Sequence, residues 1–401
     1  MNRRKFILNF ILWILAFFFG FTFKKEDDIF NFKKNYSNLE DINAQSTENI
    51  QYPILDTETG VTSKNYPYGD VRRYGAVGDA SKDDTQAFLN AISSTPSRGG
   101  KVFVPKAEYK ITGTITLKSG VLLELDSQAE IWVDGDFHGI QLALNSRVNG
   151  GVITTSLSNY SHALIYIPST IYAGVSYHVT GIRDMSIYGN GSGIGIFLDA
   201  SSNSGYLDSV TFDNVAVAKI GTGIKLYTPL GSSAWTNGNQ FTNISIQACK
   251  TDIDLENCGG NIFTGLQIQP SSGIEQVGIN LVNSHLNQFL GQLWDPQNYP
   301  SGSAIKCDTT SQENFFSVGL DRFNANTITD NSTGGNVFIS QTGIATNWLA
   351  LTNTSSLPTA TSQFRGRLAV VFGNGSTTAD IVYICLESAT GTYSWKQLIS
   401  G

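Results

Sequence analysis

The sequence of 401 residues contains little charge. Asp, Glu, Lys and Arg together make up 15% of it, whereas glycine alone occurs 40 times. Scarce charge and abundant glycine argue against a mainly helical protein, because glycine destabilises helix interiors and exposed helix faces are usually charged. The same composition, with its frequent Asn, Ser and Thr, suits an all-β protein with many turns.

Positive charge is especially scarce. Lys and Arg number 26 against 33 Asp and Glu, which gives a formal net charge of −7, and no basic run occurs after the N-terminus. A nucleic-acid partner is therefore not expected, because binding to the phosphate backbone depends on clustered Lys and Arg.

Cysteine and histidine are too few and too scattered to indicate a metal centre. The cysteines show neither the Cys-x-x-Cys spacing nor the paired histidines of zinc sites. Two of the cysteines fall in one repeat and could pair, but small buried hydrophobic residues are the favoured interpretation. We expect no cofactor and no metal ion. The residues concerned are Cys249, Cys258, Cys307, Cys385, His138, His162, His178 and His285.

What the sequence does have is a repeat. The tripeptide Asn-x-Phe recurs five times, at steps of 22, 26, 27 and 22 residues. Periods in this range are typical of solenoids, in which each repeat packs only against its neighbours. Each step also contains short β-forming runs between turns rich in Gly, Asn and Ser. The five copies begin at Asn239, Asn261, Asn287, Asn314 and Asn336.

The length of this repeat predicts one coil of a parallel β-helix, since 22–27 residues accommodate three short strands and their turns. Stacked coils would place the five asparagines above one another as an internal ladder, with each amide bonded to the turns before and after it. Upstream, residues 182–187 and 207–212 match residues 241–246, which extends the solenoid toward the N-terminus.

A short amphipathic helix is expected at residues 81–92, with Phe88 on its apolar side. Asp83 or Asp84 would cap it, because a carboxylate accepts the unpaired N–H groups of a first helical turn. A helix here would cover the apolar end and open strand edges of the first coil. The first-coil strands are expected within residues 99–105, 109–117 and 121–125.

The opening of this region resembles a known family. Tyr74-Gly-Ala-Val-Gly-Asp79, Asp83-Asp84-Thr85 and Gly99-Gly-Lys-Val-Phe-Val-Pro105 are similar to the first coil of pectate-lyase-superfamily β-helices, which include rhamnogalacturonase-like enzymes and bacteriophage tailspike or appendage depolymerases. The resemblance implies a right-handed parallel β-helix over residues 67–340, a polysaccharide partner and a homotrimer. It leaves the chemistry open, because one such fold hosts hydrolases, lyases and non-catalytic shafts.

Outward residues of stacked strands form columns with a spacing of about 4.8 Å. Counting six residues from the apolar start of each aligned strand gives one polar column, which we expect to bind a sugar chain. The alternative is an ordinary polar surface. The strand starts are Ile182, Leu207, Phe241, Phe263, Phe289 and Phe316. The column is Tyr188, Asp213, Gln247, Gln269, Asp295 and Arg322.

Candidate catalytic residues follow from the need of glycoside hydrolysis for two carboxyl groups, about 5–5.5 Å apart for retention or about 6.5–9.5 Å for inversion. Asp295 and Asp321 are the first candidates, with Trp294 stacking on the sugar and Arg322 binding it. A shift of register by one residue would turn Trp294 into the core instead. The second candidate group is Asp184, Asp208 and Asp213.

The N-terminus has the form of an export signal. Basic residues 3–5 precede an apolar run of 18 residues at 6–23, at the short end of what spans a bilayer. Basic residues before the run favour an exported remainder. No small-x-small cleavage site follows, so we expect residues 1–23 to remain as a membrane anchor, with cleavage and secretion as the alternative. The charged and polar residues 24–66 would form a linker.

After residue 340 the pattern changes. Three β-forming runs joined by Gly, Ser and Thr turns predict a small β module over residues 341–401, which resembles the end modules of phage tail-fibre and appendage proteins. Together these features predict an extracytoplasmic protein that binds and cleaves a surface polysaccharide by hydrolysis. Two alternatives stay open: a non-catalytic carbohydrate-binding or structural solenoid, and a polysaccharide lyase.

Overall fold

The computed structural model describes residues 51–169, 180–201, 205–300, 302–320, 328–332, 335–339, 352–354, 357, 359–360, 365, 368–371 and 379–400. The chain divides into two compact units, Met1–Pro53 and Ile54–Gly401, and nearly all described residues belong to the second. The expected membrane anchor, residues 1–23, lies outside the described ranges. Within those ranges no helix is both long and apolar enough to cross a bilayer.

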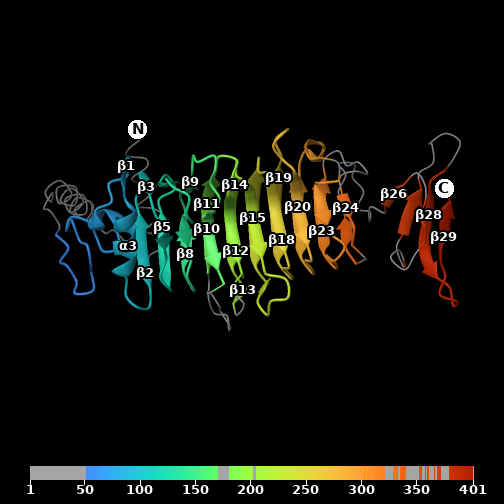
Figure 1. The fold of residues 1–401 in the computed structure, drawn as a ribbon, viewed down its shortest axis with the longest axis horizontal. Coiled ribbons are helices and arrows are strands. Elements are labelled where there is room, and N and C mark those ends of the chain that lie inside the picture. Colours follow the sequence, from blue (N-terminus) through green and yellow to red (C-terminus); the bar gives the residue numbers. More distant parts are fainter. Residues whose placement is uncertain are drawn as a thin grey trace, which may run out of the picture. The chain divides into compact units, whose positions relative to one another are not determined.

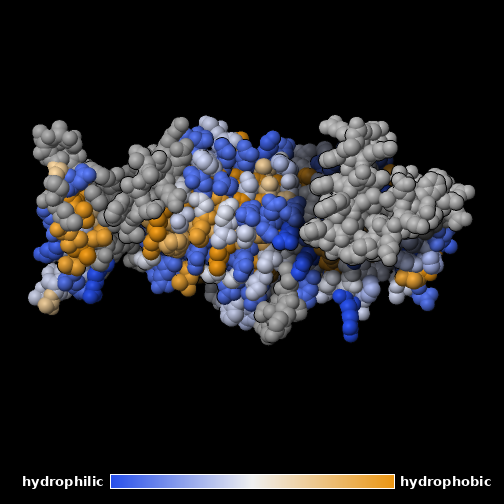
Figure 2. Space-filling model, turned by 180° about the vertical axis from the view of Figure 1, so that it is seen from behind, coloured by the Kyte–Doolittle hydropathy of each residue, from blue (hydrophilic) through white to orange (hydrophobic). Residues whose placement is uncertain are grey.

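Stacked parallel strands build the coils of a β-helix (Figure 1). Each strand pairs with the equivalent strand of the next coil, so that Phe212 lies beside Phe241, and Phe241 beside Phe263. This is the right-handed parallel β-helix that the repeat and the resemblance predict. On the side shown in Figure 2, hydrophobic residues form a broken band along the coils between hydrophilic ones.

The strands fall into two large sheets. From β11 onward, each coil contributes one long strand to sheet A and the following strand to sheet B. Sheet A contains β1 (Asp79–Asp83), β2 (Gly100–Val104), β3 (Glu108–Ile111), β5 (Val121–Leu125), β6 (Glu130–Val133), β8 (Arg147–Asn149), β9 (Val152–Thr154), β11 (Gly181–Tyr188), β14 (Thr211–Ala218), β17 (Gln240–Gln247), β19 (Ile262–Gln269), β21 (Gln288–Leu293), β23 (Phe315–Leu320) and β25 (Val337–Ile339). Sheet B contains β4 (Ile115–Thr116), β7 (Ile140–Gln141), β10 (Ala163–Pro168), β12 (Ile194–Asp199), β15 (Thr222–Tyr227), β18 (Thr251–Glu256), β20 (Val277–Val282), β22 (Ile305–Cys307) and β24 (Ile328–Asp330).

The Asn-x-Phe repeat builds two internal stacks. The phenylalanine rings lie nearly parallel, with centroids 4.3–5.0 Å apart along the series. The buried asparagines form the predicted ladder: the backbone N–H and Nδ2 of Asn261 both donate to Asn287 Oδ1, each at 3.0 Å. The same pair of bonds joins Asn287 to Asn314. The stacked rings are those of Phe212, Phe241, Phe263, Phe289, Phe316 and Phe338.

One alignment in the sequence analysis is wrong. The partner of Ile182 and Phe241 in the stack is Phe212, not Leu207. Leu207 lies on β13 (Tyr206–Asp208), which pairs with β16 (Trp235–Asn237) in a separate two-stranded sheet. Leu207 and Phe212 are both buried, so hydrophobicity alone does not distinguish the two registers. Asp213 consequently lies in the column of Arg183 and not in that of Tyr188.

A cap closes the N-terminal end. The predicted helix is α3 (Thr85–Ser93), which buries Phe88 among the apolar residues of the first coil. Asp84 occupies its N-cap position, but its carboxylate accepts from the N–H groups of Val77 and Gly78, at 2.8 and 3.0 Å. The N–H of Thr85 donates to Asp83 Oδ1 instead (3.0 Å). Asp84 therefore occupies the cap position without a side-chain bond to the helix, and Asp83 binds the N–H of the first helical residue.

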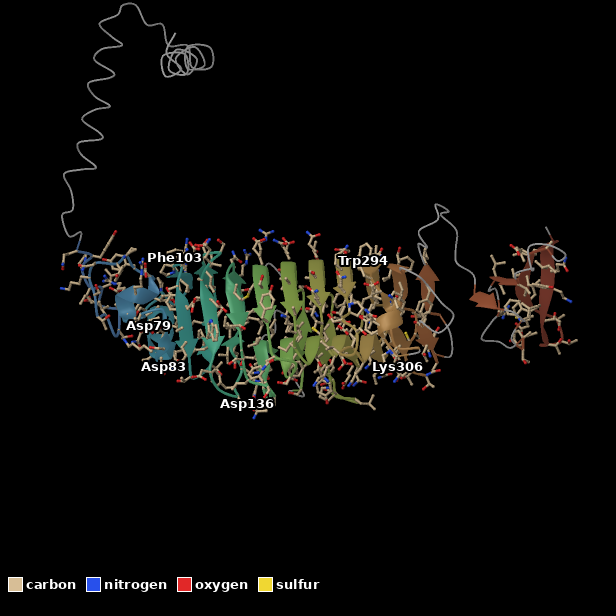
Figure 3. The ribbon with its side chains drawn as sticks, turned by 90° about the horizontal axis from the view of Figure 1, so that it is seen from above. Asp79, Asp83, Phe103, Asp136, Trp294 and Lys306 are labelled. Carbon is tan, nitrogen blue, oxygen red and sulfur yellow. The ribbon has the colours of Figure 1, made fainter. Side chains whose placement is uncertain are left out.

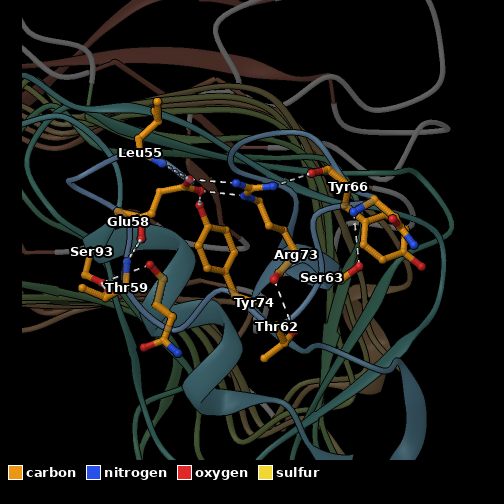
Figure 4. Close-up of polar contacts among 12 residues, drawn as sticks. Leu55, Glu58, Thr59, Thr62, Ser63, Tyr66, Arg73, Tyr74 and Ser93 are labelled. Carbon is orange, nitrogen blue, oxygen red and sulfur yellow. Dashed lines mark hydrogen bonds and ion pairs between the residues drawn. The ribbon is translucent and has the colours of Figure 1, made fainter. Parts of the chain in front are cut away.

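An ion pair ties the segment before the cap to the coils (Figure 4). The Glu58 carboxylate accepts from Nε and Nη2 of Arg73, at 2.7 and 2.8 Å, and from the hydroxyl of Tyr74 at 2.7 Å. The Arg73 side chain is fully buried. Residues from Ile54 onward thus pack with the β-helix, whereas we expected the linker to extend to residue 66.

The C-terminal residues form a sheet of their own. Its strands are β26 (Thr352–Thr354), β27 (Leu368–Val371), β28 (Ile381–Glu387) and β29 (Tyr393–Ser400), of which the last three are antiparallel neighbours. These three strands coincide with the three β-forming runs of the sequence. All four cysteines are buried thiols outside any disulfide, as the sequence analysis favoured.

Candidate functional site

Four of the predicted binding residues lie in one outward column of sheet A. Strand pairing aligns Tyr188, Gln247 and Gln269 across the coils. Trp294 takes the next place, because its backbone N–H donates to Ile268 O (2.9 Å) just after the last paired residues of β19 and β21. We call this the aromatic–amide column. In coil order it comprises Trp132, Thr154, Tyr188, Ala218, Gln247, Gln269 and Trp294.

Asp295, which we expected in this column, lies one residue beyond it. In β11, β14, β17 and β19 a residue with positive φ adds one position to the strand, and β21 lacks this residue. Counting six residues from Phe289 therefore gives Asp295, whereas the residue in the column is Trp294. Asp295 instead begins the 3₁₀ turn η2 (Pro296–Asn298), and its Oδ1 accepts from Gln297 Nε2 (3.1 Å). Its predicted partners Asp321 and Arg322 lie outside the described residues.

The second predicted carboxylate group is only partly brought together. Asp184 and Asp213 lie on the neighbouring strands β11 and β14. Asp213 Oδ2 accepts from Nε and Nη2 of Arg183, at 3.0 and 2.7 Å, and Asp184 Oδ1 accepts from Asn214 Nδ2 at 2.6 Å. Asp208 belongs to β13 instead. Its Oδ1 is buried without a partner, and burial raises the pKa of this carboxyl.

An open depression of about 330 Å³ adjoins the Arg183–Asp213 pair. It offers guanidinium, amide and hydroxyl groups but one carboxylate only. Hydrolysis by an acid and a second carboxylate therefore has no pair of groups in this depression. The lining residues are Arg147, Asn149, Gly181, Ile182, Arg183, Thr211, Phe212, Asp213, Gln240 and Thr242.

The sequence analysis missed a second column, on the outer face of sheet B. It combines aromatic rings at one end with cations, a carboxylate and an amide further along. We call this the sheet B column. In coil order it comprises Gln141, Tyr166, Phe197, Lys225, Asp254, Asn280, Lys306 and Thr329.

A lysine lies at the centre of the charged part of this column. Lys225 Nζ lies 3.2 Å from Asp254 Oδ2 and 2.8 Å from Glu256 Oε1, two carboxylates of the next coil. Asn280 Nδ2, one coil further, donates to Asp254 Oδ1 (2.8 Å). Burial opposes the charge of Lys225, but the carboxylates outweigh it and raise the pKa of the ammonium group. Asp254 is 9% exposed, so this cluster is firmly held.

The aromatic part of the column is also ordered by contacts. The ring of His138 stacks on that of Tyr166, with centroids 3.7 Å apart. The Tyr166 hydroxyl donates to Asp199 Oδ2 (3.0 Å), and Phe197 lies next to Tyr166 with a centroid separation of 5.8 Å. Burial, together with the charge of the adjacent His162, lowers the pKa of His138 to about 4. His138 is therefore a neutral aromatic surface at physiological pH.

The two columns lie on different sides of the coils. In Figure 3, Trp294 of the aromatic–amide column is at one side of the stack, and Lys306 of the sheet B column is at the opposite side, together with Asp136.

Asp136 accepts from the backbone N–H of Ser161 (2.7 Å) and lies 3.0 Å from His162 Nδ1, and these contacts lower the pKa of its carboxyl.

A sequence signal for the sheet B column does exist. After each long strand the chain repeats a short pattern in which buried Ile and Leu alternate with outward residues, as in Gly223-Ile-Lys-Leu-Tyr227 and Asp252-Ile-Asp-Leu-Glu256. Aligning the outward positions of this pattern gives the column. The sequence analysis aligned only the strands that follow Asn-x-Phe.

The stacked parallel coils place this chain in the class of parallel β-helix proteins, and α3 covers its first coil. Residues 68–280 match the family described as rhamnogalacturonase A/epimerase, pectate lyase-like. The chain belongs to this family. The matched range extends from the cap to β20 and contains most of both columns.

Similar proteins include enzymes and adhesins. The chain is 41% identical over 63 residues to the plasmin and fibronectin-binding protein A of Streptococcus pneumoniae (strain ATCC BAA-255 / R6), a match that spans 15% of this chain and 9% of the relative.

Solved structures of similar fold include ORF18 of Geobacillus virus E2, with 16% identity, a TM-score of 0.48 and coverage of 83% of this chain and 76% of the other. The Streptococcus pneumoniae surface adhesin PfbA has 13% identity, a TM-score of 0.39 and coverage of 82% and 98%. The family 28 exopolygalacturonase of Yersinia enterocolitica has 13% identity, a TM-score of 0.28 and coverage of 70% and 76%.

Proposed function

We propose that this protein binds a polysaccharide outside the cytoplasm, on the outer face of sheet B. The observation that carries the proposal is the continuous register of outward side chains from Tyr166 to Asn280 over neighbouring coils, with contacts that order both its aromatic and its charged part. Aromatic rings offer apolar faces on which sugar rings stack, and ordered charged or amide groups bind hydroxyl groups. The basic and apolar N-terminal segment supports export.

The proposal predicts that binding depends on side chains that face outward next to the column. Tyr227 and Glu256 are neighbours across β15 and β18, and both are partly exposed. Replacing Tyr227 by Ala should weaken binding about 3- to 10-fold, because the stacking surface is lost. Glu256→Gln should weaken it less, since the amide oxygen still accepts from Lys225.

The test is affinity electrophoresis of the full chain, purified in mild detergent, in gels that contain surface polysaccharides, teichoic acids or pectic fragments. The matched control is Glu124→Gln, which removes a carboxylate paired with Lys101 on sheet A. Retardation by one of the polymers that Tyr227→Ala weakens and Glu124→Gln preserves would support the site. The proposal fails if no polymer retards the chain. It also fails if Tyr227→Ala and Glu256→Gln are both retarded like the parent.

A second candidate function is hydrolysis of the bound chain, and a specific distance favours it. Asp254 Oδ2 and Glu256 Oε1 both contact Lys225 Nζ, so these oxygens are no farther apart than about 6 Å. That limit for one pair of oxygens is compatible with the retaining geometry. Both oxygens accept from the same ammonium group, so Lys225 would have to move aside before either carboxyl donates a proton.

Cleavage is tested by measuring new reducing ends together with the absorbance of unsaturated sugars. Reducing ends without that absorbance, abolished in both Asp254→Asn and Glu256→Gln, would establish hydrolysis by this pair. Unsaturated products would identify a lyase and refute the two-carboxylate mechanism. Binding without any product would leave the protein as a carbohydrate-binding solenoid.

A further inference from the structure

A second array of aromatic side chains lies on the other side of the coils. Trp132, Tyr188 and Trp294 are 37%, 40% and 41% exposed, unusually high values for such large side chains. All three belong to the aromatic–amide column, although more than 100 residues separate the first from the last in the sequence. Their common register shows that the coils bring distant aromatic residues onto one line.

The positions between Tyr188 and Trp294 are uncharged. Within the column they are Ala218, Gln247 and Gln269. The neighbouring outward column, two residues earlier in each strand, is also uncharged over these coils. Amides and hydroxyls offer donors and acceptors without a net charge, which matches the hydroxyl groups of neutral sugars. That neighbouring column consists of Ser186, Ala216, Ser245, Gln267 and Gln292.

The orientation of the exposed indole is fixed. Trp294 Nε1 donates to Gln267 Oε1 (2.9 Å), which lies on the preceding coil in the neighbouring column. The next glutamine, Gln292, extends over Gly319, where a Cβ atom would come within 2.1 Å of Gln292 Oε1. The glycine therefore leaves room for this amide. An aromatic ring held by an amide, with further amides beside it, is pre-organised for a ligand.

The spacing also fits an extended sugar chain. Successive coils advance by about 4.8 Å, so Trp132 and Tyr188 are about 10 Å apart along the axis and Tyr188 and Trp294 about 19 Å. A β-linked pyranose chain in its extended form advances by a distance close to one coil per ring. Such a chain, lying parallel to the axis, would place one sugar over each coil.

We propose that the aromatic–amide column binds a single extended chain of neutral, β-linked sugars along the axis of the β-helix. Tyr188 and Trp294 stack on rings at the two ends of a five-coil stretch, and the glutamines between them bind hydroxyl groups. Trp132 extends the same track by two coils. This track is separate from the sheet B column and does not depend on it.

The experiment is calorimetric titration of the full chain with β-1,4-linked gluco- and xylo-oligosaccharides of increasing length. Affinity should rise until the ligand reaches five rings, one for each coil from β11 to β21, and then level off. Trp294→Ala should weaken binding of the five-ring ligand about tenfold, and Gln247→Ala about threefold. A charged polymer such as polygalacturonate should not compete.

Matched variants make the outcome decisive. Trp235→Ala removes another exposed indole, 48% accessible and packed against Tyr206 on the β13–β16 sheet, and should leave binding unchanged. The proposal is overturned if Trp294→Ala binds like Trp235→Ala, if affinity stays flat beyond two rings, or if Tyr227→Ala alone abolishes binding, which would assign the ligand to sheet B.

Discussion

Replacing Asn287 by Ala tests the internal ladder. Asn287 Oδ1 accepts from the backbone N–H and from Nδ2 of Asn261, each at 3.0 Å. Its own Nδ2 donates to Asn314 Oδ1 at 3.0 Å and to the carbonyl of Cys258 at 3.3 Å. Alanine removes all four bonds while the backbone stays able to form the same turn.

The expected loss can be worked out group by group. The backbone N–H of Asn261 is left without a partner at a fully buried position, which costs about 1–3 kcal/mol. The other three bonds involve groups that keep another partner, so each costs about 0.5–1 kcal/mol. The free energy of local unfolding should therefore fall by about 2.5–6 kcal/mol.

Hydrogen exchange measured by mass spectrometry is the appropriate assay, because a solenoid loses stability locally and need not unfold in one step. Peptides around Asn261 should exchange at least roughly 60-fold faster in the variant, since about 1.4 kcal/mol corresponds to a factor of ten. Peptides of the first coils, near α3, should exchange as in the parent.

The control is Asn190→Ala, which removes an exposed asparagine that donates to the carbonyl of Ser156 (2.8 Å). Its effect should stay near 0.5 kcal/mol. If Asn287→Ala changes exchange no more than this control, the ladder is not a stabilising element. If exchange accelerates equally in all coils, coupling is not limited to neighbours and the solenoid argument is wrong.

Three further predictions concern the cap, the ring stack and sheet B. The paired Arg73 lowers the pKa of Glu58 from 4.5 to about 2. The cap should therefore keep this stabilisation above pH 4.5 and lose it as the pH falls toward 2. The melting temperature of Glu58→Gln should lack this acid dependence, and an unchanged dependence would refute the assignment. Phe263→Ala, within the ring stack, should lower stability by about 3–5 kcal/mol in chemical denaturation, and a loss below 1 kcal/mol would contradict tight packing. Lys225→Met should destabilise by about 1–3 kcal/mol, because it leaves two carboxylates without their cation. The loss should be much smaller in a background that carries Asp254→Asn and Glu256→Gln, and equal losses in both backgrounds would exclude the electrostatic explanation.

The fold could be predicted because its repeat is internal. An asparagine or a phenylalanine at a fixed place in every coil contacts its own counterpart in the next, so the same residue type recurs and is visible in the sequence. Outward residues have no such constraint. Their columns follow only from the register, and the sequence reveals the register less reliably than it reveals the buried stacks.

The errors in the candidate site have two physical causes. The first cause is an extra residue with positive φ, which is Asn243 in β17 and Gly265 in β19. The strand β21 lacks this residue, and its sequence gives no sign of the difference. The second cause is the long connection between β12 and β14, which contains an extra strand with Leu207 buried at a plausible position. The sheet B column was missed because alternating apolar and polar residues are common to all half-buried strands.

The ladder also has a direction. In every link Nδ2 of one asparagine donates to Oδ1 of the asparagine in the following coil, so the amide dipoles add along the axis and polarise one another. The C-terminal end of the series is the amide of Asn336, whose Nδ2 hydrogens have partial positive charge. There Asn336 Nδ2 donates to the carboxylate of Asp330 (3.0 Å), which supplies the negative counterpart. The β-helix thus contains, in its side chains, an analogue of the macrodipole of an α-helix, with an aspartate as its terminal counter-charge.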